Sequence, residues 1–525
     1  MKRTKIKNEN TITKTATRTL LLTILSQYFI LISNSTVQKP PPLPILPLPS
    51  APQLQWQLAS MALFLHFGPN TFTDSEWGTG RVDPKVFNPA KFNASQWVQV
   101  AKNAGFNRVI LTAKHHDGFC LWPSEYTDYS VKSSDWRNGT GDVVGELALA
   151  AKEAGVALGI YLSPWDRHES SYGKTLEYNE FYMGQMTELL TRYGEIKEVF
   201  LDGAKGEGEK DMEYFFDSWF SLIHQLQPGA VIFSDAGPDS RWIGDEDGVA
   251  DSTCWSLFNQ SDAKIGGTDP RYLQGGDPEG HDWVPGECDV SIRPGWFWHE
   301  SEAPKSAQKL LDIYYKSVGR NCLLLLNLPP NSSGLISAED IQVLQEFSEL
   351  RRTIFSNNLA ENALVIASSS RGGISDSRFD PYNVLKEGIY TYWAPEENRY
   401  DWALFIDLQE SVSFNVLQVQ EPIHMGQRII EFHFDILNEE GKWEKVINGT
   451  TVGYQRLLQF PTVKSQQLKF VIDKSRADPL IAYLGIYMDE FSIVSSLSNT
   501  SSQAYVNGSH ILQRSMYNRS EIAAM

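Results

Sequence analysis

The sequence predicts an α/β fold: a (β/α)8-like barrel of the TIM type, expected to be irregular, followed by an antiparallel β-sandwich. From about residue 54 to residue 355, apolar runs with the composition of buried strands alternate with amphipathic helical segments. Two of these runs end abruptly in ionisable side chains, at the position where a β/α barrel places its active site. Beyond residue 362, apolar and polar residues alternate strictly, as in an antiparallel sheet with one buried face.

The chain begins with the features of an export signal over residues 1–35. Six basic residues lie among the first 18 positions, an apolar stretch spans 20–32, and small polar residues at 33–36 offer a cleavage region. The apolar stretch is short for a membrane span, and an uncleaved anchor is the alternative interpretation. Residues 36–53 are rich in proline and are expected to form an extended linker without packed structure.

The barrel domain is predicted over residues 54–355. Its strands are expected at 62–67, 108–112, 157–162, 198–201, 230–234 and 322–328. Its helices are expected at 95–104, 143–154, 177–193, 212–225 and 305–318. Asp142 is expected to cap the second helix, and Gly105 and Gly155 to end the first two. No Gly-rich phosphate-binding motif follows the first strand, which favours a closed barrel over an open sheet. Six of the eight expected strands are visible, so the barrel is expected to be irregular.

The second domain, the β-sandwich, is predicted over residues 356–495. Residues 402–406, 430–436 and 468–472 alternate in the manner of half-buried strands, and turn signals separate the runs. No run in this region ends in clustered acids or histidines, so the chemistry is assigned to the barrel. Residues 496–525 are rich in Ser and Asn and are expected to form a glycosylated tail.

The net charge and the N-glycosylation sequons limit the classes of function that the chain can have. The net charge of −18 disfavours binding to nucleic acid or anionic membranes and leaves neutral ligands as the expected substrates. Nine Asn-x-Ser/Thr sequons independently indicate secretion. They lie at Asn34, Asn93, Asn138, Asn259, Asn331, Asn448, Asn499, Asn507 and Asn518.

The four cysteines are too scattered for a zinc site or a disulfide framework. One or two bridges are permitted in an oxidising compartment, and the pairing is left open. Cys120 and Cys322 lie beside apolar runs and are expected to be buried free thiols.

Three histidines follow the first two strands. His66 ends the first strand, and the adjacent His115 and His116 end the second. Side chains at successive strand ends converge on one barrel mouth, and neutral imidazoles there suit the recognition of hydroxyl groups. A metal site is the alternative interpretation, although His115 and His116 would point to opposite sides of a continuing strand.

Two carboxylates also stand at predicted strand ends. Asp202 follows a fully apolar strand, and Glu246 lies in an acidic loop after the next one. Alone, Asp202 is best explained as a strand-end cap and Glu246 as a solvated turn. Together they supply a carboxylate to attack an anomeric carbon and a carboxylic acid to protonate the departing oxygen, which is what cleavage of a glycosidic bond requires.

Several long motifs resemble those of one family. The stretch 65–72 with Glu76-Trp77-Gly78, the block 114–119 and Leu201-Asp202-Gly203 are similar to motifs of the α-L-fucosidases of glycoside hydrolase family 29. The segment 286–299 is similar to the branch that prefers α-1,3- and α-1,4-linked fucose, and the plant secreted enzymes are the members it most resembles. The resemblance covers about residues 54–490, including a C-terminal sandwich similar to discoidin-like carbohydrate-binding modules.

The resemblance implies a retaining exo-α-L-fucosidase that removes α-1,3/1,4-linked L-fucose from oligosaccharides or N-glycans, without a metal or organic cofactor. Asp202 matches the family's nucleophile, and Glu246 its acid/base, with Asp245 replacing the family's Asn and Glu287 as the reserve candidate. The implied substrate-binding residues are His66, Glu76, Trp77, His115, His116, Tyr161 and Trp296.

Two geometric expectations follow from this resemblance. Retention predicts that the carboxyl groups of Asp202 and Glu246 lie about 5–5.5 Å apart. The C5-methyl group of fucose needs an apolar wall, which Trp77, Phe67 or Trp296 is expected to provide.

The enzyme is expected to be secreted, in the apoplast if it comes from a plant, with no nucleic-acid partner and no membrane contact after signal cleavage. The alternatives are a metal-dependent barrel hydrolase and a non-catalytic, fucose-binding, lectin-like protein.

Overall fold

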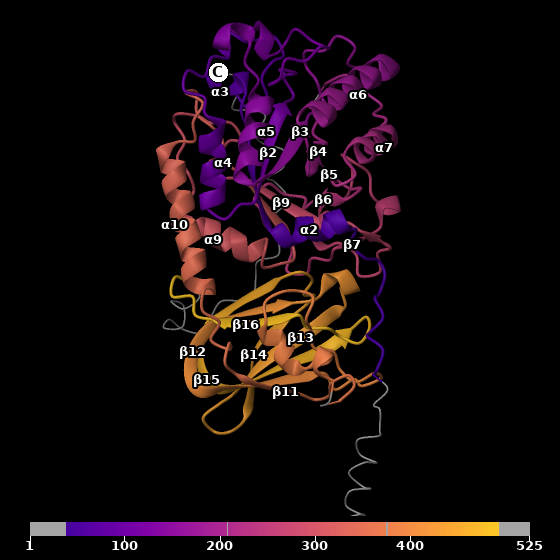
Figure 1. Ribbon diagram of the computed structural model, residues 1–525, viewed down its shortest axis with the longest axis vertical. Coiled ribbons are helices and arrows are strands. Elements are labelled where there is room, and N and C mark those ends of the chain that lie inside the picture. The colour runs from indigo at the N-terminus through magenta and orange to yellow at the C-terminus, as the bar shows by residue number, and fades with distance from the viewer. Residues whose placement is uncertain (1–37, 207, 374–375, 493–525) are drawn as a thin grey trace, which may run out of the picture.

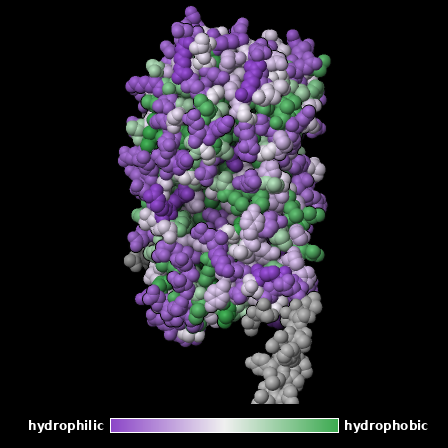
Figure 2. Space-filling model, viewed as in Figure 1, coloured by the Kyte–Doolittle hydropathy of each residue, from purple (hydrophilic) through white to green (hydrophobic). Residues whose placement is uncertain are grey.

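The computed structural model describes residues 38–206, 208–373 and 376–492. The predicted export signal and the Ser/Asn-rich tail lie outside these residues. The barrel domain and the C-terminal domain stack along the long axis of the molecule (Figure 1). On the face seen in Figure 2, hydrophilic side chains cover most of both domains, and small hydrophobic patches are scattered among them. Within the described ranges, no helix combines the length and the apolar character that a bilayer crossing requires.

Eight parallel strands close the predicted barrel, in the order β1-β10-β9-β6-β5-β4-β3-β2. The strands are β1 (Met61–Leu65), β2 (Arg108–Lys114), β3 (Ala157–Leu162), β4 (Glu198–Phe200), β5 (Val231–Ser234), β6 (Ser240–Trp242), β9 (Gly286–Ser291) and β10 (Leu323–Asn327). The sequence pattern missed β6 and β9. Strand β6 has only three residues, and β9 carries the acids Glu287 and Asp289, so neither has the apolar composition that identifies a buried strand.

Helices surround the barrel and connect its strands (Figure 1). They are α2 (Ala51–Ala59), α3 (Pro69–Thr73), α4 (Ala94–Asn103), α5 (Val143–Ala154), α6 (Thr175–Arg192), α7 (Phe216–Leu226), α8 (Pro270–Gly275), α9 (Ala307–Lys316) and α10 (Ala338–Phe355). The predicted cap of α5 is confirmed: Asp142 accepts a hydrogen bond from the Gly145 amide at 2.8 Å, and Gly155 ends the helix at a φ of 68°. A short hairpin of β7 (Leu257–Phe258) and β8 (Asp282–Trp283) lies outside the barrel sheet.

Helix α2 closes the N-terminal end of the barrel with the buried ring of Trp56. The Trp56 indole donates to the Glu198 carboxylate at 2.9 Å, and Arg108 forms an ion pair with the same carboxylate at 3.1 Å. Glu287 is fully buried beside Glu198 and has no other partner for either oxygen among the described residues. Burial, and then the Glu198 charge, hold the pKa of Glu287 well above its usual range, so the two carboxyl groups share a proton that Glu287 carries.

This buried acid predicts a stability that falls as pH rises. The folded chain holds a proton on Glu287 that the unfolded chain releases near pH 4.3. Between that pH and the raised pKa of the folded state, each unit of increase in pH therefore lowers the free energy of unfolding by about 1.4 kcal/mol. We expect Glu287→Gln to be more resistant to urea than the unmodified protein at about pH 8, with a smaller difference at about pH 5.

The measurement is urea unfolding of both proteins at the two pH values. Glu440→Gln is the control, since Glu440 is 71 % exposed in a surface turn. An equal pH dependence in Glu287→Gln and in the unmodified protein would show that Glu287 is ionised in the folded state.

The C-terminal domain is an antiparallel sheet of six strands, in the order β11-β12-β15-β13-β14 with β16 paired to β12. The strands are β11 (Leu364–Ala367), β12 (Ala403–Gln420), β13 (Ile429–Leu437), β14 (Trp443–Gly449), β15 (Arg456–Ser475) and β16 (Tyr483–Tyr487). Register shifts between Asp407 and Val412 interrupt the long β12–β15 pair. A buried cluster that includes Leu404, Phe414 and Phe470 forms the core of this domain.

The proline-rich segment differs from the expected free linker. Residues 38–50 lie along the C-terminal domain: Arg371 donates to the Pro40 carbonyl at 2.7 Å, Arg428 to the Leu43 carbonyl at 2.6 Å, and the Ile45 amide to Met425 at 3.1 Å. Helix α2 then begins at Ala51, inside the predicted linker. Proline favours the extended backbone of this segment, but arginine donors on the sheet domain fix it in place.

The cysteine prediction is half correct. Cys120 is a buried free thiol as expected, but Cys322 forms a disulfide with Cys288, which joins β9 to the start of β10. Neighbouring parallel strands bring these two residues together from a sequence separation of 34, which spacing alone could not reveal. Cys254 is buried and free in the same cluster.

Candidate active site

All nine residues that the sequence nominated line one pocket at the C-terminal end of the barrel strands. Its volume is about 220 Å³. The lining comprises Phe64, His66, Glu76, Trp77, His115, His116, Tyr161, Phe200, Asp202, Gly203, Ala204, Phe233, Asp235, Trp242, Glu246, Asp289 and Trp296. A pocket of this size, closed below by the barrel core, suits a single monosaccharide unit.

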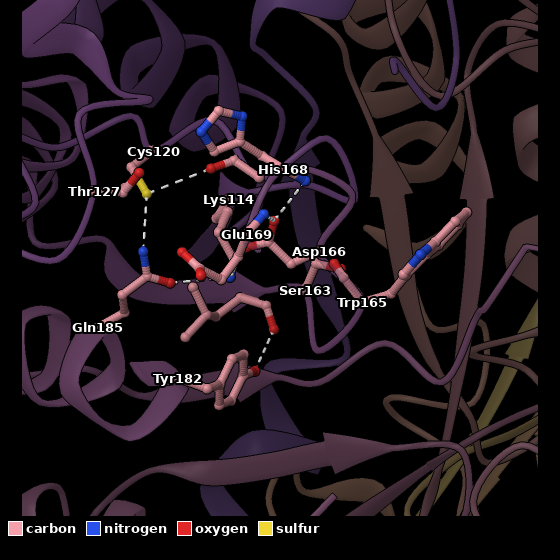
Figure 3. Close-up of polar contacts among 12 residues, drawn as sticks. Lys114, Cys120, Thr127, Ser163, Trp165, Asp166, His168, Glu169, Tyr182 and Gln185 are labelled. Atoms are coloured by element: carbon pink, nitrogen blue, oxygen red, sulfur yellow. Dashed lines mark hydrogen bonds and ion pairs between the residues drawn. The ribbon is translucent and has the colours of Figure 1, made fainter. Parts of the chain in front are cut away.

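The histidine pair does not diverge as a continuing strand would require. Strand β2 ends at Lys114, and the rings of His115 and His116 lie 4.1 Å apart on the same side, both in the pocket. Lys114 is not part of the pocket lining and instead points toward Asp166 and Gln185 (Figure 3). The histidines lie beyond the end of the strand, and the register shift between Thr112 and Lys114 breaks the alternation of side chains before it reaches them.

The hydrogen bonds of His66 and His116 fix their tautomers. The side-chain oxygen of Asn327 lies 2.9 Å from Nδ1 of His66, while the Asn327 amide donates to the Trp296 carbonyl at 2.7 Å. Nδ1 of His66 is therefore the donor. Ser163 donates to the Trp165 carbonyl at 2.6 Å, so it accepts from Nδ1 of His116 at 2.7 Å. Both rings keep Nε2 as an unprotonated acceptor.

The three histidines are neutral. Burial lowers the pKa of His66 to about 3, and burial followed by the neighbouring His116 lowers that of His115 well below its usual range. Burial also lowers the pKa of His116, against the opposing effect of Asp202. A neutral Nε2 atom can accept a hydrogen bond from a hydroxyl group. Among the residues the structure describes, no group of three or more His, Cys, Asp or Glu side chains is arranged to hold a metal ion.

Ser163 is a residue that the sequence analysis missed, and it offers a test of the tautomer assignment. We expect Ser163→Ala to release Nδ1 of His116 and raise KM by up to about tenfold, with a smaller change in kcat, because a binding acceptor is lost. The measurement is steady-state kinetics together with the ¹⁵N shifts of His116. Ser163→Thr, which keeps the hydroxyl group, should restore both values; an unchanged tautomer in Ser163→Ala would contradict the assignment.

A buried polar network behind the pocket positions the loop that follows β3 (Figure 3). Lys114 is fully buried and contacts Asp166 at 2.9 Å and Gln185 at 2.9 Å. Asp166 in turn accepts from the amides of His168 and Glu169, each at 2.9 Å, and so fixes the loop that follows β3.

The fixed loop carries Trp165 into contact with the pocket. The Trp165 ring lies 4.7 Å from the ring of His116 and 5.5 Å from that of Trp77. Trp77 itself is 48 % exposed, so its face remains available to a ligand. The network therefore holds one wall of the pocket in place.

Asp202 lies directly beyond β4, and each of its two carboxylate oxygens accepts one hydrogen bond. Tyr161 donates to Oδ2 at 2.9 Å, and the Ala204 amide donates to Oδ1 at 2.7 Å. Nε2 of His116 lies 3.8 Å from Oδ2. The side chain is 28 % exposed and faces the pocket, so the carboxylate is oriented but accessible.

Asp235 follows β5 and lines the pocket beside Asp202, although the sequence analysis missed it. Burial, and then the Asp202 charge, raise the pKa of Asp235 to about 6. The Gly266 amide donates to it at 2.8 Å. It could have been found as an acid directly after the apolar run 230–234, the same signal that identified Asp202.

Glu246 lies in the loop after β6, where the Trp296 indole donates to it at 3.3 Å. Asp245 shapes this loop: it accepts from the Asp247 amide at 3.0 Å and from Gln274 at 3.0 Å. An aspartate therefore performs the turn-forming role at this position.

A further missed acid, Asp289 of β9, lies near Glu246. Burial and then the Glu246 charge raise its pKa well above its usual range, and the Trp242 indole donates to it at 2.9 Å. Its strand carried no apolar signal, so sequence could not place it.

The reserve candidate Glu287 is not part of the pocket. It belongs to the same strand as Asp289 but lies two residues earlier, in the proton-sharing pair at the opposite end of the barrel. Side chains two residues apart on a strand share a face, so both point into the barrel, at different depths.

Aromatic rings of the barrel interior form the apolar floor of the pocket. Phe200 and Phe233 stack at 3.8 Å, and Phe64 lies 5.0 Å from Phe200. Phe67, which the sequence analysis offered for the apolar wall, packs instead against Phe87 and other core rings outside the pocket.

Glu76 is fixed by the segment that follows β9. It accepts from the amides of Trp296 at 2.9 Å and Phe297 at 3.3 Å, and from His299 at 2.6 Å. His299 also contacts Asp74 at 2.6 Å. These contacts tie the Glu76-Trp77 loop to Trp296 across the pocket mouth.

A barrel whose strand ends place two oriented carboxyl groups and three histidines around one small pocket has the arrangement of a glycoside hydrolase. Comparison with known proteins agrees. A family model described as α-L-fucosidase matches residues 65–351. The chain is 72% identical to α-L-fucosidase 1 of Arabidopsis thaliana over 88% of this chain and 92% of that protein.

A relative from Oryza sativa subsp. japonica is 64% identical over 92% of this chain and 93% of its own. The structure of a GH29 fucosidase of Ruminococcus gnavus in complex with fucose superposes with a TM-score of 0.81 at 34% identity, covering 87% of this chain and 98% of that one. The chain belongs to the α-L-fucosidase family, glycoside hydrolase family 29, and is an enzyme that hydrolyses α-L-fucosides.

Proposed function

We propose that the enzyme is a retaining exo-α-L-fucosidase acting on α-1,3- and α-1,4-linked fucose, with Asp202 as nucleophile and Glu246 as acid/base. The observation that carries the proposal is that both carboxyl groups open into one pocket and each is oriented by an aromatic donor: Tyr161 for Asp202, Trp296 for Glu246. The linkage preference rests on the resemblance of segment 286–299.

In the first step Asp202 attacks the anomeric carbon while Glu246 gives its proton to the departing glycosidic oxygen. This forms a β-linked fucosyl ester and releases the remaining glycan. In the second step Glu246 takes a proton from water, and the resulting hydroxide attacks the same carbon and frees Asp202. Two inversions give net retention, and the separation of about 5–5.5 Å stays the geometric prediction.

The pocket also suits the sugar. The Nε2 atoms of His66 and His116 accept hydrogen bonds from fucose hydroxyl groups, and the oxygens of Glu76 add further acceptors. The aromatic floor that includes Phe64 and Phe200 gives the C5-methyl group an apolar surface. Because the pocket is closed at its base by the barrel core, only a terminal residue enters, which explains exo action.

Secretion and glycosylation belong to the same proposal. The disulfide between Cys288 and Cys322 is typical of an oxidising compartment. Asn93, Asn138 and Asn448 are exposed sequon residues on the described surface and are the proposed glycosylation sites. Extracellular N-glycans are then the proposed substrates, in the apoplast if the source is a plant.

The test is to incubate the purified enzyme with linkage-defined fucosylated oligosaccharides and to measure released fucose. We expect release from α-1,3 and α-1,4 linkages, slower release from α-1,2, and the α-anomer of fucose as first product by NMR. A β-anomer would overturn retention, and binding without release would indicate a lectin. Dialysis against a chelator should leave activity unchanged; its loss would favour the metal-dependent alternative.

A further inference from the structure

A second large groove lies where the barrel domain meets the C-terminal domain, and we call it the junction groove. Its volume is about 430 Å³. It is lined by Leu58 of α2, Tyr314 of α9, Phe355 of α10, Glu387, Gly388, Ile389 and Tyr390, Gln418 and Gln420 of β12, Gln455, and Tyr483 and Tyr487 of β16. It shares no lining residue with the catalytic pocket. Because α2 closes the N-terminal end of the barrel, the groove lies away from the mouth at which fucose enters.

Three glutamine amides form a connected polar row in the junction groove. The Gln455 side-chain oxygen accepts from Gln418 at 3.2 Å and from Gln420 at 3.0 Å, while its amide contacts the Tyr314 hydroxyl at 3.4 Å. Each of Gln418 and Gln420 uses one N–H in this row, and an amide has two N–H donors and two acceptor lone pairs. The row is held in place but keeps donors and acceptors for a ligand.

Aromatic rings surround this polar row. Tyr483 and Tyr487 are buried and joined through their hydroxyl groups at 2.8 Å. Tyr390 lines the groove and is 74 % exposed, so its ring is open to a ligand. The exposed ring of Tyr390 beside the amide groups matches a sugar, which has apolar C–H faces and hydroxyl edges.

The charges that line the junction groove indicate which class of ligand it can bind. The lining has one carboxylate, Glu387, and no lysine or arginine, and the chain as a whole carries −18. A phosphate, nucleotide or anionic polysaccharide would find no cationic partner here. A neutral polyhydroxylated chain satisfies the amides and the carboxylate together, since vicinal hydroxyl groups bind such planar groups in pairs.

We propose that the junction groove is a second carbohydrate-binding site, which holds a neutral oligosaccharide segment of the glycan that the catalytic pocket trims. The inference rests on the proposed function only for the identity of that glycan. Engagement of one segment raises the effective concentration of fucosyl termini on other branches or neighbouring chains near the pocket. Large glycans therefore gain from the site and small fucosides do not.

The test uses a fucose-free, galactose-terminated biantennary N-glycan as the probe, which the catalytic pocket cannot cleave. With the unmodified enzyme and saturating free L-fucose, we expect saturation-transfer NMR signals from the probe. Tyr390→Ala and Gln420→Ala should each weaken binding roughly tenfold. Tyr400→Ala is the matched control, since Tyr400 is 78 % exposed on the same domain and is not part of the groove.

Steady-state kinetics provide a second test of the junction groove. Tyr390→Ala should leave kcat/KM for an aryl fucoside unchanged and lower it a few-fold for the fucosylated form of the same N-glycan. No saturation transfer, displacement of the probe by L-fucose, or equal binding in Tyr390→Ala and Tyr400→Ala would overturn the inference. Failure of the proposed function would show separately, as absence of fucose release by the unmodified enzyme from the linkage panel.

Discussion

Asp202→Ala should lower kcat by about 10³–10⁵-fold, because it removes the proposed nucleophile. The fold should survive. The carboxylate is 28 % exposed and its removal leaves only the Tyr161 hydroxyl and one backbone amide to be solvated from the pocket. We expect the free energy of unfolding to change by less than about 1 kcal/mol. The measurements are single-turnover kinetics and urea unfolding on the same preparations.

Azide makes this test specific for the nucleophile. The anion fits the space that the carboxylate leaves and attacks an activated α-fucoside from the same side, so the rescued product should be β-L-fucosyl azide. Asp211→Ala is the control, since Asp211 is an exposed carboxylate on the same loop outside the pocket. Turnover close to that of the unmodified enzyme in Asp202→Ala would refute the assignment.

Glu246→Ala should have an effect that depends on the leaving group. For a fucosylated oligosaccharide, kcat/KM should fall by about 10²–10⁴-fold, because the departing alkoxide needs a proton. For an aryl fucoside with an acidic phenol, the first step needs little help, and hydrolysis of the fucosyl ester becomes limiting. Both kcat and KM should then fall, and the ester should accumulate on Asp202, visible by mass spectrometry.

Azide again distinguishes the roles. In Glu246→Ala it attacks the β-linked ester and needs no base, so the product should be α-L-fucosyl azide, the opposite anomer from the Asp202 variant. Asp247→Ala serves as control, because Asp247 lies in the same loop but outside the pocket. Equal losses on both classes of substrate, with no azide product, would assign the acid/base role elsewhere, and Asp289 would be the next residue to test.

Much of the fold could be predicted from sequence because most of its strands are apolar. Strands such as β2 and β10 are fully buried and contain the residue types that such burial requires. Strand β9 escaped detection because Glu287 and Asp289 point into the barrel, where one shares a proton and the other faces the pocket. A pattern of apolar residues cannot identify a strand whose interior side chains are acids.

Part of the candidate site could be predicted from the sequence for a similar reason. Asp202 and His66 each follow an apolar run directly, so the strand itself marks their position. Ser163 acts through the tautomer of His116, and such a role depends on two hydrogen bonds that only coordinates reveal. The disulfide partner of Cys322 likewise depends on which strands are neighbours in the barrel.

The proline-rich segment at 38–50 has a consequence for biosynthesis. Arg428 contacts Leu43 across 385 positions of sequence, and Arg476 contacts Leu46 across 430. During translation, residues 38–50 therefore emerge several hundred residues before the arginines that bind them. The segment is secured only once the C-terminal domain has been made, so its attachment reports that this domain has folded.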